Sequence, residues 1–200
     1  ILKSISGRLE RQIQFLIEIV KTKQIFRKTK LFDKSRFENA AEHAWRLALM
    51  ALVLGEYVNE KIDLAKIIKM ILIHDIVEID AGDTIVYDTK SRTEAQEKES
   101  LAAERIFGIL PEDQKNTFIT LWKEFEERRS PEAKFAAAID RFEPILQNRL
   151  TDYYAWKAHG ISYAQLQDGN RHIQDGSEVI WAVVQEIFSE AKDKSEIKDE

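Results

Sequence analysis

The spacing of apolar residues is the feature that most limits the folds open to this chain. Apolar residues recur at intervals of three and four through most of the sequence, as at Ile5, Leu9, Ile13, Leu16 and Val20. This period matches one face of an α-helix, whereas a half-buried strand would alternate at every second position. Only seven Gly and three Pro are available to interrupt helices. We therefore predict an all-α protein.

Capping residues and prolines indicate where the helices begin. Asn39 followed by Glu42 forms a capping box, and Pro111 and Pro131 stand at favoured first-turn positions. Helices are predicted over about 4–23, 39–58, 63–80, 91–107, 111–127, 131–150 and 176–191, and a polar loop joins the first two. The helix at about 39–58 is apolar almost all round, so we expect it to be buried. One domain should cover residues 1–190, and the charged residues 191–200 should form a frayed tail.

Composition excludes several classes of protein. The chain has no cysteine, so any metal ligands must be imidazole or carboxylate groups. The net charge of -5 argues against a nucleic-acid-binding surface, which needs clustered Lys and Arg. No stretch approaches the roughly 20 apolar residues of a membrane span, and the first residues lack the pattern of a secretory signal. We expect a cytoplasmic protein that binds neither nucleic acid nor membrane.

Three predicted helices carry ionisable residues on faces that are otherwise apolar. These residues are His43, the adjacent pair His74 and Asp75, and Asp140. An unpaired buried charge costs several kcal/mol, so each needs a partner. Taken singly, each has an ordinary explanation, since a core His finds a hydrogen bond and Asp140 pairs with Arg141. Together they form a mixed nitrogen and oxygen site suited to a divalent cation, for which Mn, Co, Fe, Ni and Zn all qualify.

The same residues carry a family resemblance. A His, then a His-Asp pair, then a distant Asp, all on helices, resembles the HD-domain metal-dependent phosphohydrolase superfamily. The stretches "SRFENAAEHAWRLALMAL", "HDIVEIDAGDTIVYD" and "AIDRFEPILQN" look like its 5'-deoxynucleotidase subgroup. The resemblance implies a single-domain HD-type helical bundle, hydrolysis of (deoxy)nucleoside 5'-monophosphates, and a homodimer. Because no His lies between Asp75 and Asp140, it also implies one metal ion rather than two.

Two acidic residues after the His-Asp pair are candidate catalytic groups. Glu78 follows His74 by one helical turn, so its carboxylate is able to orient or deprotonate the attacking water. The resemblance assigns Glu78 this acid or base role, and the alternative is a solvated charge at a helix end. Asp83 matches a position that contacts the nucleoside or assists catalysis in the deoxynucleotidases. Its alternative role is to cap the turn after Gly82.

A phosphate-binding site requires positive charge, and the nearest supply is the basic loop before the second helix. Arg27, Lys28 and Arg36 are the candidates, and the alternative is that this loop is merely solvated. Known deoxynucleotidases carry Arg-Trp here, whereas counting back from His43 without gaps gives Lys28 and Thr29. The preference for a 2'-deoxy sugar is therefore open.

Two other hypotheses for the function remain beside nucleoside monophosphate hydrolysis. One is hydrolysis of another phosphate ester, such as a nucleoside triphosphate or a sugar phosphate, and the other is a non-catalytic nucleotide-binding module.

Overall fold

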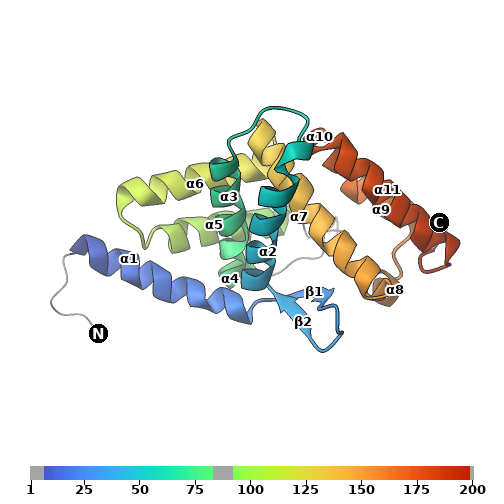
Figure 1. Cartoon of the computed structure of the whole chain (residues 1–200). Helices are drawn as coiled ribbons and strands as arrows, with labels where there is room; N and C mark the ends of the chain where they lie inside the picture. Colours follow the sequence, from blue (N-terminus) through green and yellow to red (C-terminus); the bar gives the residue numbers. More distant parts are fainter. Residues whose placement is uncertain (1–6, 83–91, 199–200) are drawn as a thin grey trace.

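The computed structural model describes residues 7–82 and 92–198 and confirms the mainly helical fold (Figure 1). The longer α-helices and the two strands are α1 (Gly7–Glu18), β1 (Phe26–Lys30), β2 (Phe37–Asn39), α2 (Ala40–Leu54), α3 (Leu64–Ile73), α5 (Arg92–Phe107), α6 (Glu112–Glu127), α7 (Pro131–Leu150), α8 (Tyr154–His159), α9 (Tyr163–Asn170) and α11 (Glu178–Asp193). Short helical segments are η1 (Ile19–Gln24), η2 (Gly55–Tyr57), η3 (His74–Val77), α4 (Glu78–Ala81) and α10 (Ile173–Gly176).

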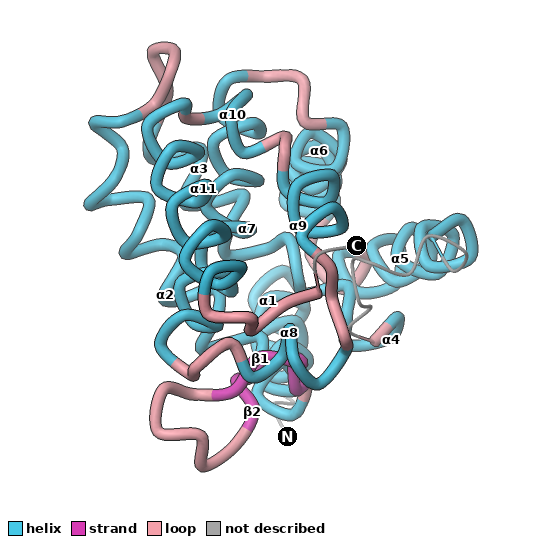
Figure 2. Tube along the Cα trace, turned by 90° about the vertical axis from the view of Figure 1, so that its right-hand side faces the viewer, coloured by secondary structure: helices cyan, strands magenta, loops and turns pink. Residues whose placement is uncertain are grey.

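Helices α2, α3 and α7 pack against one another; they lie in the middle of the view in Figure 1, and Figure 2 shows α2 and α3 toward one side of the molecule. The side chains between them are large, apolar and fully buried; they include Leu47, Ile67, Met70, Ile71, Phe135 and Ile139. Asn39 caps α2 through the expected capping box, and Ser130 caps α7 just before Pro131. This core fixes the relative positions of α2, which carries His43, α7, which carries Asp140, and α3, which leads directly into the turn with His74 and Asp75.

The predicted helix over 63–80 is divided at the His-Asp pair. Helix α3 ends at Ile73, the 3₁₀ turn η3 contains His74 and Asp75, and α4 continues to Ala81. Gly82 follows with a φ of 78°, a left-handed conformation that Gly adopts without strain. A 3₁₀ turn between α-helical segments is a tighter arrangement that often marks a functional position.

The prediction of a loop over residues 27–38 was wrong at both of its ends. Strand β1 pairs with β2 in an antiparallel hairpin, in which Phe26 lies opposite Asn39 and Lys30 opposite Phe37. The polar, charged sequence does not predict these strands, because contacts made by other elements hold the hairpin. Gln147 of α7 donates a 2.7 Å hydrogen bond to the Lys30 carbonyl, and the Lys30 ammonium lies 4.2 Å from the centre of the Tyr154 ring.

The expectation that the helix over 39–58 is buried was only half right. Helix α2 buries His43, Leu47 and Ala51, whereas its opposite face leaves Trp45 65% and Val53 68% exposed. An apolar helix face needs a neighbouring element to cover it, and no such element lies over this face in the described part of the chain.

The C-terminal end continues past the expected limit of the domain. Helix α11 reaches Asp193, and Tyr163 N donates a 2.9 Å hydrogen bond to the Lys198 carbonyl. The division of the chain at residue 190 stays a prediction.

Among the described residues, no helix combines the length and the apolar character needed to cross a lipid bilayer. The cytoplasmic location also stays a prediction.

Candidate metal centre

His43 projects from the first turns of α2 into the contact with α7. Its side chain is fully buried, and Nε2 lies 3.0 Å from Asp140 Oδ1 and 3.9 Å from Asp75 Oδ2. Asp140 is reached because α7 runs through the core beside α2, which brings residues 97 positions apart into contact. Two of the predicted ligands from distant parts of the sequence therefore meet here.

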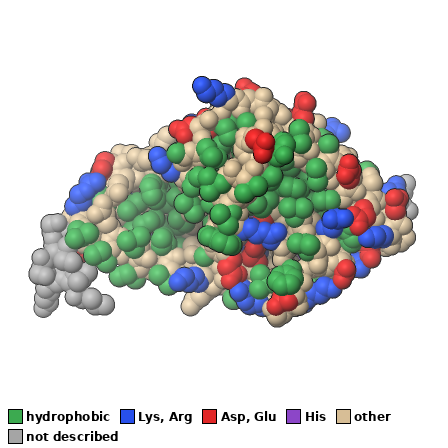
Figure 3. All heavy atoms as spheres, in the orientation of Figure 1, with side chains coloured by type: hydrophobic (Ala, Val, Ile, Leu, Met, Phe, Trp, Pro, Cys, Tyr) green, Lys and Arg blue, Asp and Glu red, His purple; other side chains and the backbone are tan. Residues whose placement is uncertain are grey.

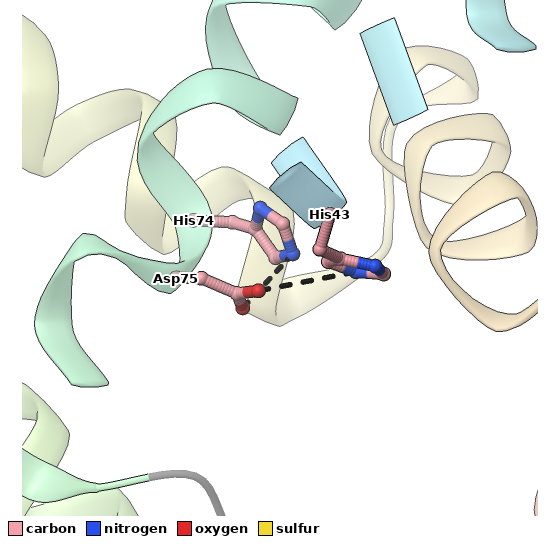
Figure 4. Close-up of side chains that lie close together, drawn as sticks. All are labelled: His43, His74 and Asp75. Carbon is pink, nitrogen blue, oxygen red and sulfur yellow. Dashed lines mark ion pairs between the residues drawn. The ribbon is translucent and has the colours of Figure 1, made fainter. Parts of the chain in front are cut away.

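His74 and Asp75 enter the same site from η3. The Nε2 atom of His74 lies 2.9 Å from Asp75 Oδ1 and 3.5 Å from Asp140 Oδ1. Figure 4 shows the Asp75 carboxylate joined by dashed lines to both histidine rings, and the two ring centres are 6.0 Å apart. The Nδ1 atom of His74 donates a 2.7 Å hydrogen bond to the Ile71 carbonyl, which leaves Nε2 to face the carboxylates. The structure thus brings all four predicted ligands together.

Charge is strongly concentrated in this cluster. Burial opposes the charged form of His74, yet Asp75 and Asp140 raise its pKa to about 10. Burial likewise opposes ionisation of Asp75, but His74 and Arg27 lower its pKa to about 2. The pKa of His43 is raised and that of Asp140 is lowered by the hydrogen bond between them, despite the burial of both. The carboxylates therefore stay ionised, and their negative charge favours a cation at the imidazole nitrogens. This cation is either a proton or a metal ion.

The donor set fits a divalent cation. His43, His74 and Asp75 each offer one ligand atom, and these atoms lie within 4.8 Å of one another. Asp140 Oδ1 adds a fourth donor beside both Nε2 atoms. Within the described residues the buried Nε2 of His74 makes no hydrogen bond, although carboxylate oxygens lie close to it. A metal ion placed among these atoms would satisfy this nitrogen and balance the two carboxylates.

The predicted substrate-binding residues lie in different surroundings. Arg27 of β1 reaches the centre and donates a 2.8 Å hydrogen bond from Nη1 to Asp75 Oδ2. Lys28 is exposed on the same strand, and Arg36 pairs with Glu42 at the start of α2. Of the two candidate catalytic acids, Glu78 is half-buried at the first residue of α4, one turn after His74, and Asp83 lies outside the described residues.

Four acidic residues near the centre were not predicted. Glu143 and Glu38 are buried beside the Nδ1 atom of His43, at 3.2 Å and 3.5 Å respectively. Glu99 of α5 and Glu126 of α6 are close enough for the charge of Asp75 to act on both of them. Glu143 could have been found from the sequence, since it follows Asp140 by three positions and therefore shares its helix face. Nothing in the local sequence around the other three points to the centre.

Fold and site together define a class: a mainly helical protein whose candidate metal centre combines a His, a His-Asp pair and a distant Asp. Residues 19–181 match the family model described as HD domain. The chain belongs to the HD domain family.

Relatives with assigned names and a solved structure agree with this membership. The 5'-deoxynucleotidase HDDC2 of Bos taurus is 30% identical over 176 residues, which cover 82% of this chain and 84% of the relative. The Homo sapiens protein of the same name is 30% identical, with 77% and 80% covered. The crystal structure of a predicted metal-dependent phosphohydrolase from Magnetospirillum magnetotacticum MS-1 is 41% identical, with a TM-score of 0.91, and the match covers 96% of this chain and all of that one.

Proposed function

We propose that this protein is a metal-dependent phosphomonoesterase that hydrolyses (deoxy)nucleoside 5'-monophosphates to nucleoside and phosphate. The observation that carries the proposal is the cluster of His43, His74, Asp75 and Asp140, with the guanidinium of Arg27 in contact with Asp75. The relatives named 5'-deoxynucleotidase, which match most of the chain, support the choice of substrate.

The residues of the site have distinct roles in this reaction. When bound, one divalent cation polarises the phosphoryl group and lowers the pKa of a water molecule. Glu78 accepts a proton from the water that attacks phosphorus in line with the leaving nucleoside oxygen. The P–O bond to the nucleoside breaks, and the leaving 5'-oxygen takes up a proton from Glu78 or from solvent. Asp83 contacts the nucleoside or assists the proton transfer, as the resemblance implies. No covalent phosphoenzyme is required.

Arg27 is the residue best placed to bind the phosphate. A phosphoryl group at the metal centre would lie beside Asp75, and the Arg27 guanidinium already contacts that carboxylate. Arg is suited to this role because its planar fork of donors matches phosphate oxygens. Lys28 is exposed on the same strand and Arg36 pairs with Glu42. The substrate-binding role of these two residues stays a prediction.

The proposal is tested by measuring phosphate release from ribo- and deoxynucleoside monophosphates with added Mn, Co, Fe, Ni or Zn. Both sugars are needed because Lys28 and Thr29 replace the Arg-Trp of known deoxynucleotidases. A nucleoside triphosphate and a sugar phosphate extend the panel to the alternative substrates. Turnover of one of these instead would identify another phosphate ester as the substrate, and nucleotide binding without turnover would indicate a non-catalytic module.

Substitutions in the centre separate metal binding from turnover. His74→Ala and Asp75→Ala should lose bound metal and activity, because each removes a ligand from a four-residue site. Glu78→Ala should retain metal while phosphate release falls by about 10²-fold or more, as expected for loss of a general base. Elemental analysis of the purified variants and the phosphate assay report on the two properties separately. Full metal content and full activity in Asp75→Ala would contradict the assigned site.

The exposed apolar surface supports a homodimer. Large apolar side chains between 41% and 68% exposed lie on three helices and η1; we name them the apolar face: Leu9, Leu16, Ile17, Val20, Trp45, Leu49, Leu52, Val53, Val179 and Val183. Figure 3 shows apolar side chains gathered over these helices on one side of the molecule. Contiguous apolar patches of more than a few hundred Å² are rare on monomeric proteins and mark interaction sites. A second copy of the chain is the partner that the resemblance implies.

A further inference from the structure

The buried face of His43 turned away from the metal centre has its own polar partner. Nδ1 of His43 lies 3.2 Å from Glu143 Oε2, and both side chains are fully buried. An imidazole that binds a metal through Nε2 must carry its proton on Nδ1, and that proton needs an acceptor in a dry interior. The carboxylate of Glu143 occupies the position of that acceptor.

Glu143 is itself held in place by a pattern of alternating contacts between α2 and α7. On α2, Arg46 follows His43 by three positions; on α7, Glu143 follows Asp140 by three, and Gln147 is one turn further on. His43 lies between Asp140 and Glu143, while Arg46 contacts Glu143 Oε1 at 2.8 Å and also donates to Gln147 Oε1. Each contact therefore fixes the next one along the two helices.

We propose that Glu143 is a positioning residue for the metal ligand His43. It accepts the Nδ1 proton, fixes the tautomer whose Nε2 lone pair faces Asp140 and Asp75, and prevents rotation of the ring. A carboxylate acceptor also makes the opposite nitrogen a better ligand, because it stabilises positive charge on the imidazole. This inference rests on the metal-binding part of the proposed function and does not depend on the substrate.

The two histidines of the centre are held in different ways. Nδ1 of His74 donates to the carbonyl of Ile71, a backbone group of the preceding helix that is fixed as soon as α3 forms. His43 has no such local acceptor among the described residues and relies on a side chain of another helix. The orientation of His43 is therefore sensitive to single substitutions in α7. Glu38 also lies near Nδ1, but at 3.5 Å it is the more distant carboxylate.

The first test measures the affinity of the purified, metal-free chain for Zn²⁺ and Mn²⁺ by calorimetric titration. In Glu143→Gln the amide group is able to present a donor to Nδ1, which favours the wrong tautomer. Metal affinity should fall by about 10- to 100-fold, the range seen when such supporting residues are replaced.

Two further variants serve as comparisons. Glu38→Gln should show a smaller loss of metal affinity. Glu132→Gln removes a carboxylate from the first turn of α7 that pairs with Lys66, and it should leave metal affinity unchanged.

A second measurement tests the role of Glu143 without a substitution, in case Glu143→Gln does not fold. In the unmodified protein loaded with Zn²⁺, ¹⁵N NMR of the histidine rings should show a protonated Nδ1 and a metal-bound Nε2 on His43. A proton on Nε2 would overturn the assignment, and so would unchanged metal affinity in folded Glu143→Gln. A larger loss in Glu38→Gln than in Glu143→Gln would also overturn it. Absence of phosphatase activity would refute the proposed function, but it would not change what the metal affinities and the NMR spectra say about His43 and Glu143.

Discussion

Glu99 on α5 is a half-buried carboxyl group that interacts electrostatically with two other acids. Burial, followed by the negative charges of Glu126 and Asp75, raises its pKa from 4.5 to about 7. The folded state therefore binds a proton at Glu99 more tightly than the unfolded chain does. By linkage, the resulting stabilisation is complete below about pH 4.5 and is lost as the pH rises to about 7.

Replacing this residue should consequently produce a stability change that depends on pH. Glu99→Gln has nearly the same shape as the protonated acid, so its melting temperature should match that of the wild-type protein near pH 4.5. Above pH 7 the variant should melt at a higher temperature, because it avoids burying a negative charge near Asp75. Thermal unfolding in the presence of a chelator checks this, with exposed Glu97→Gln as the control on the same helix. A pH-independent difference would show that the charge of Glu99 is not the cause.

At the residue scale, the sequence singles out ionisable residues where they interrupt an apolar helix face. His43, His74, Asp75 and Asp140 stand out in this way, and the structure places them in one cluster, although their roles stay predictions. Glu143 was missed because its position gains meaning only when α7 is known to lie beside α2. Arg27 was one of three basic candidates, and only the fold of β1 distinguishes it from Lys28 and Arg36.

At the scale of elements, periodicity located the helices and failed for the hairpin. Helices α6 and α7 begin and end within a residue of the predicted limits, since Pro111, Ser130 and Pro131 mark their first turns. Strands β1 and β2 carry no alternation of polar and apolar residues. Their pairing depends on Gln147 and Tyr154, which lie more than a hundred positions along the chain. Local sequence does not contain that information.

The contact between α10 and α7 predicts an element-scale effect on stability. A Cβ atom added to Gly176 would lie 2.5 Å from the Lys134 carbonyl oxygen and 2.9 Å from the Ala138 Cβ. Gly176→Ala must therefore push α10 away from α7, and we expect a loss of about 1–3 kcal/mol in the free energy of unfolding. Denaturant unfolding measures this loss.

Gly55 provides the matched control for that substitution. An added Cβ there would meet only Leu64 Cδ1 at 3.7 Å, and its φ of -59° suits any residue. Gly55→Ala should be neutral or stabilise the protein by about 0.4–1 kcal/mol, because the unfolded chain loses freedom. Equal effects at the two positions would contradict the close approach of α10 to α7.

At the scale of the whole molecule, the apolar face is the surface through which we expect two copies to associate. Its members are large apolar side chains between 41% and 68% exposed, and covering them with a partner removes apolar area from water, which favours association by about 25 cal/mol per Å². The face lies on α1, η1, α2 and α11, so dimerisation would also brace α2, the helix that carries His43.

A charge placed within the apolar face should therefore dissociate the proposed homodimer. Trp45 is 65% exposed and Val53 is 68% exposed on the same side of α2, and a Glu at either position would bury an unpaired carboxylate in the interface. Light scattering coupled to size-exclusion chromatography should give twice the mass of the 23.3 kDa chain for the wild type and the single mass for Trp45→Glu and Val53→Glu. Leu101→Glu changes a side chain that is 73% exposed on α5, outside the face, and should remain dimeric. A monomeric wild type, or dimers in all three variants, would show that the apolar face does not join two copies.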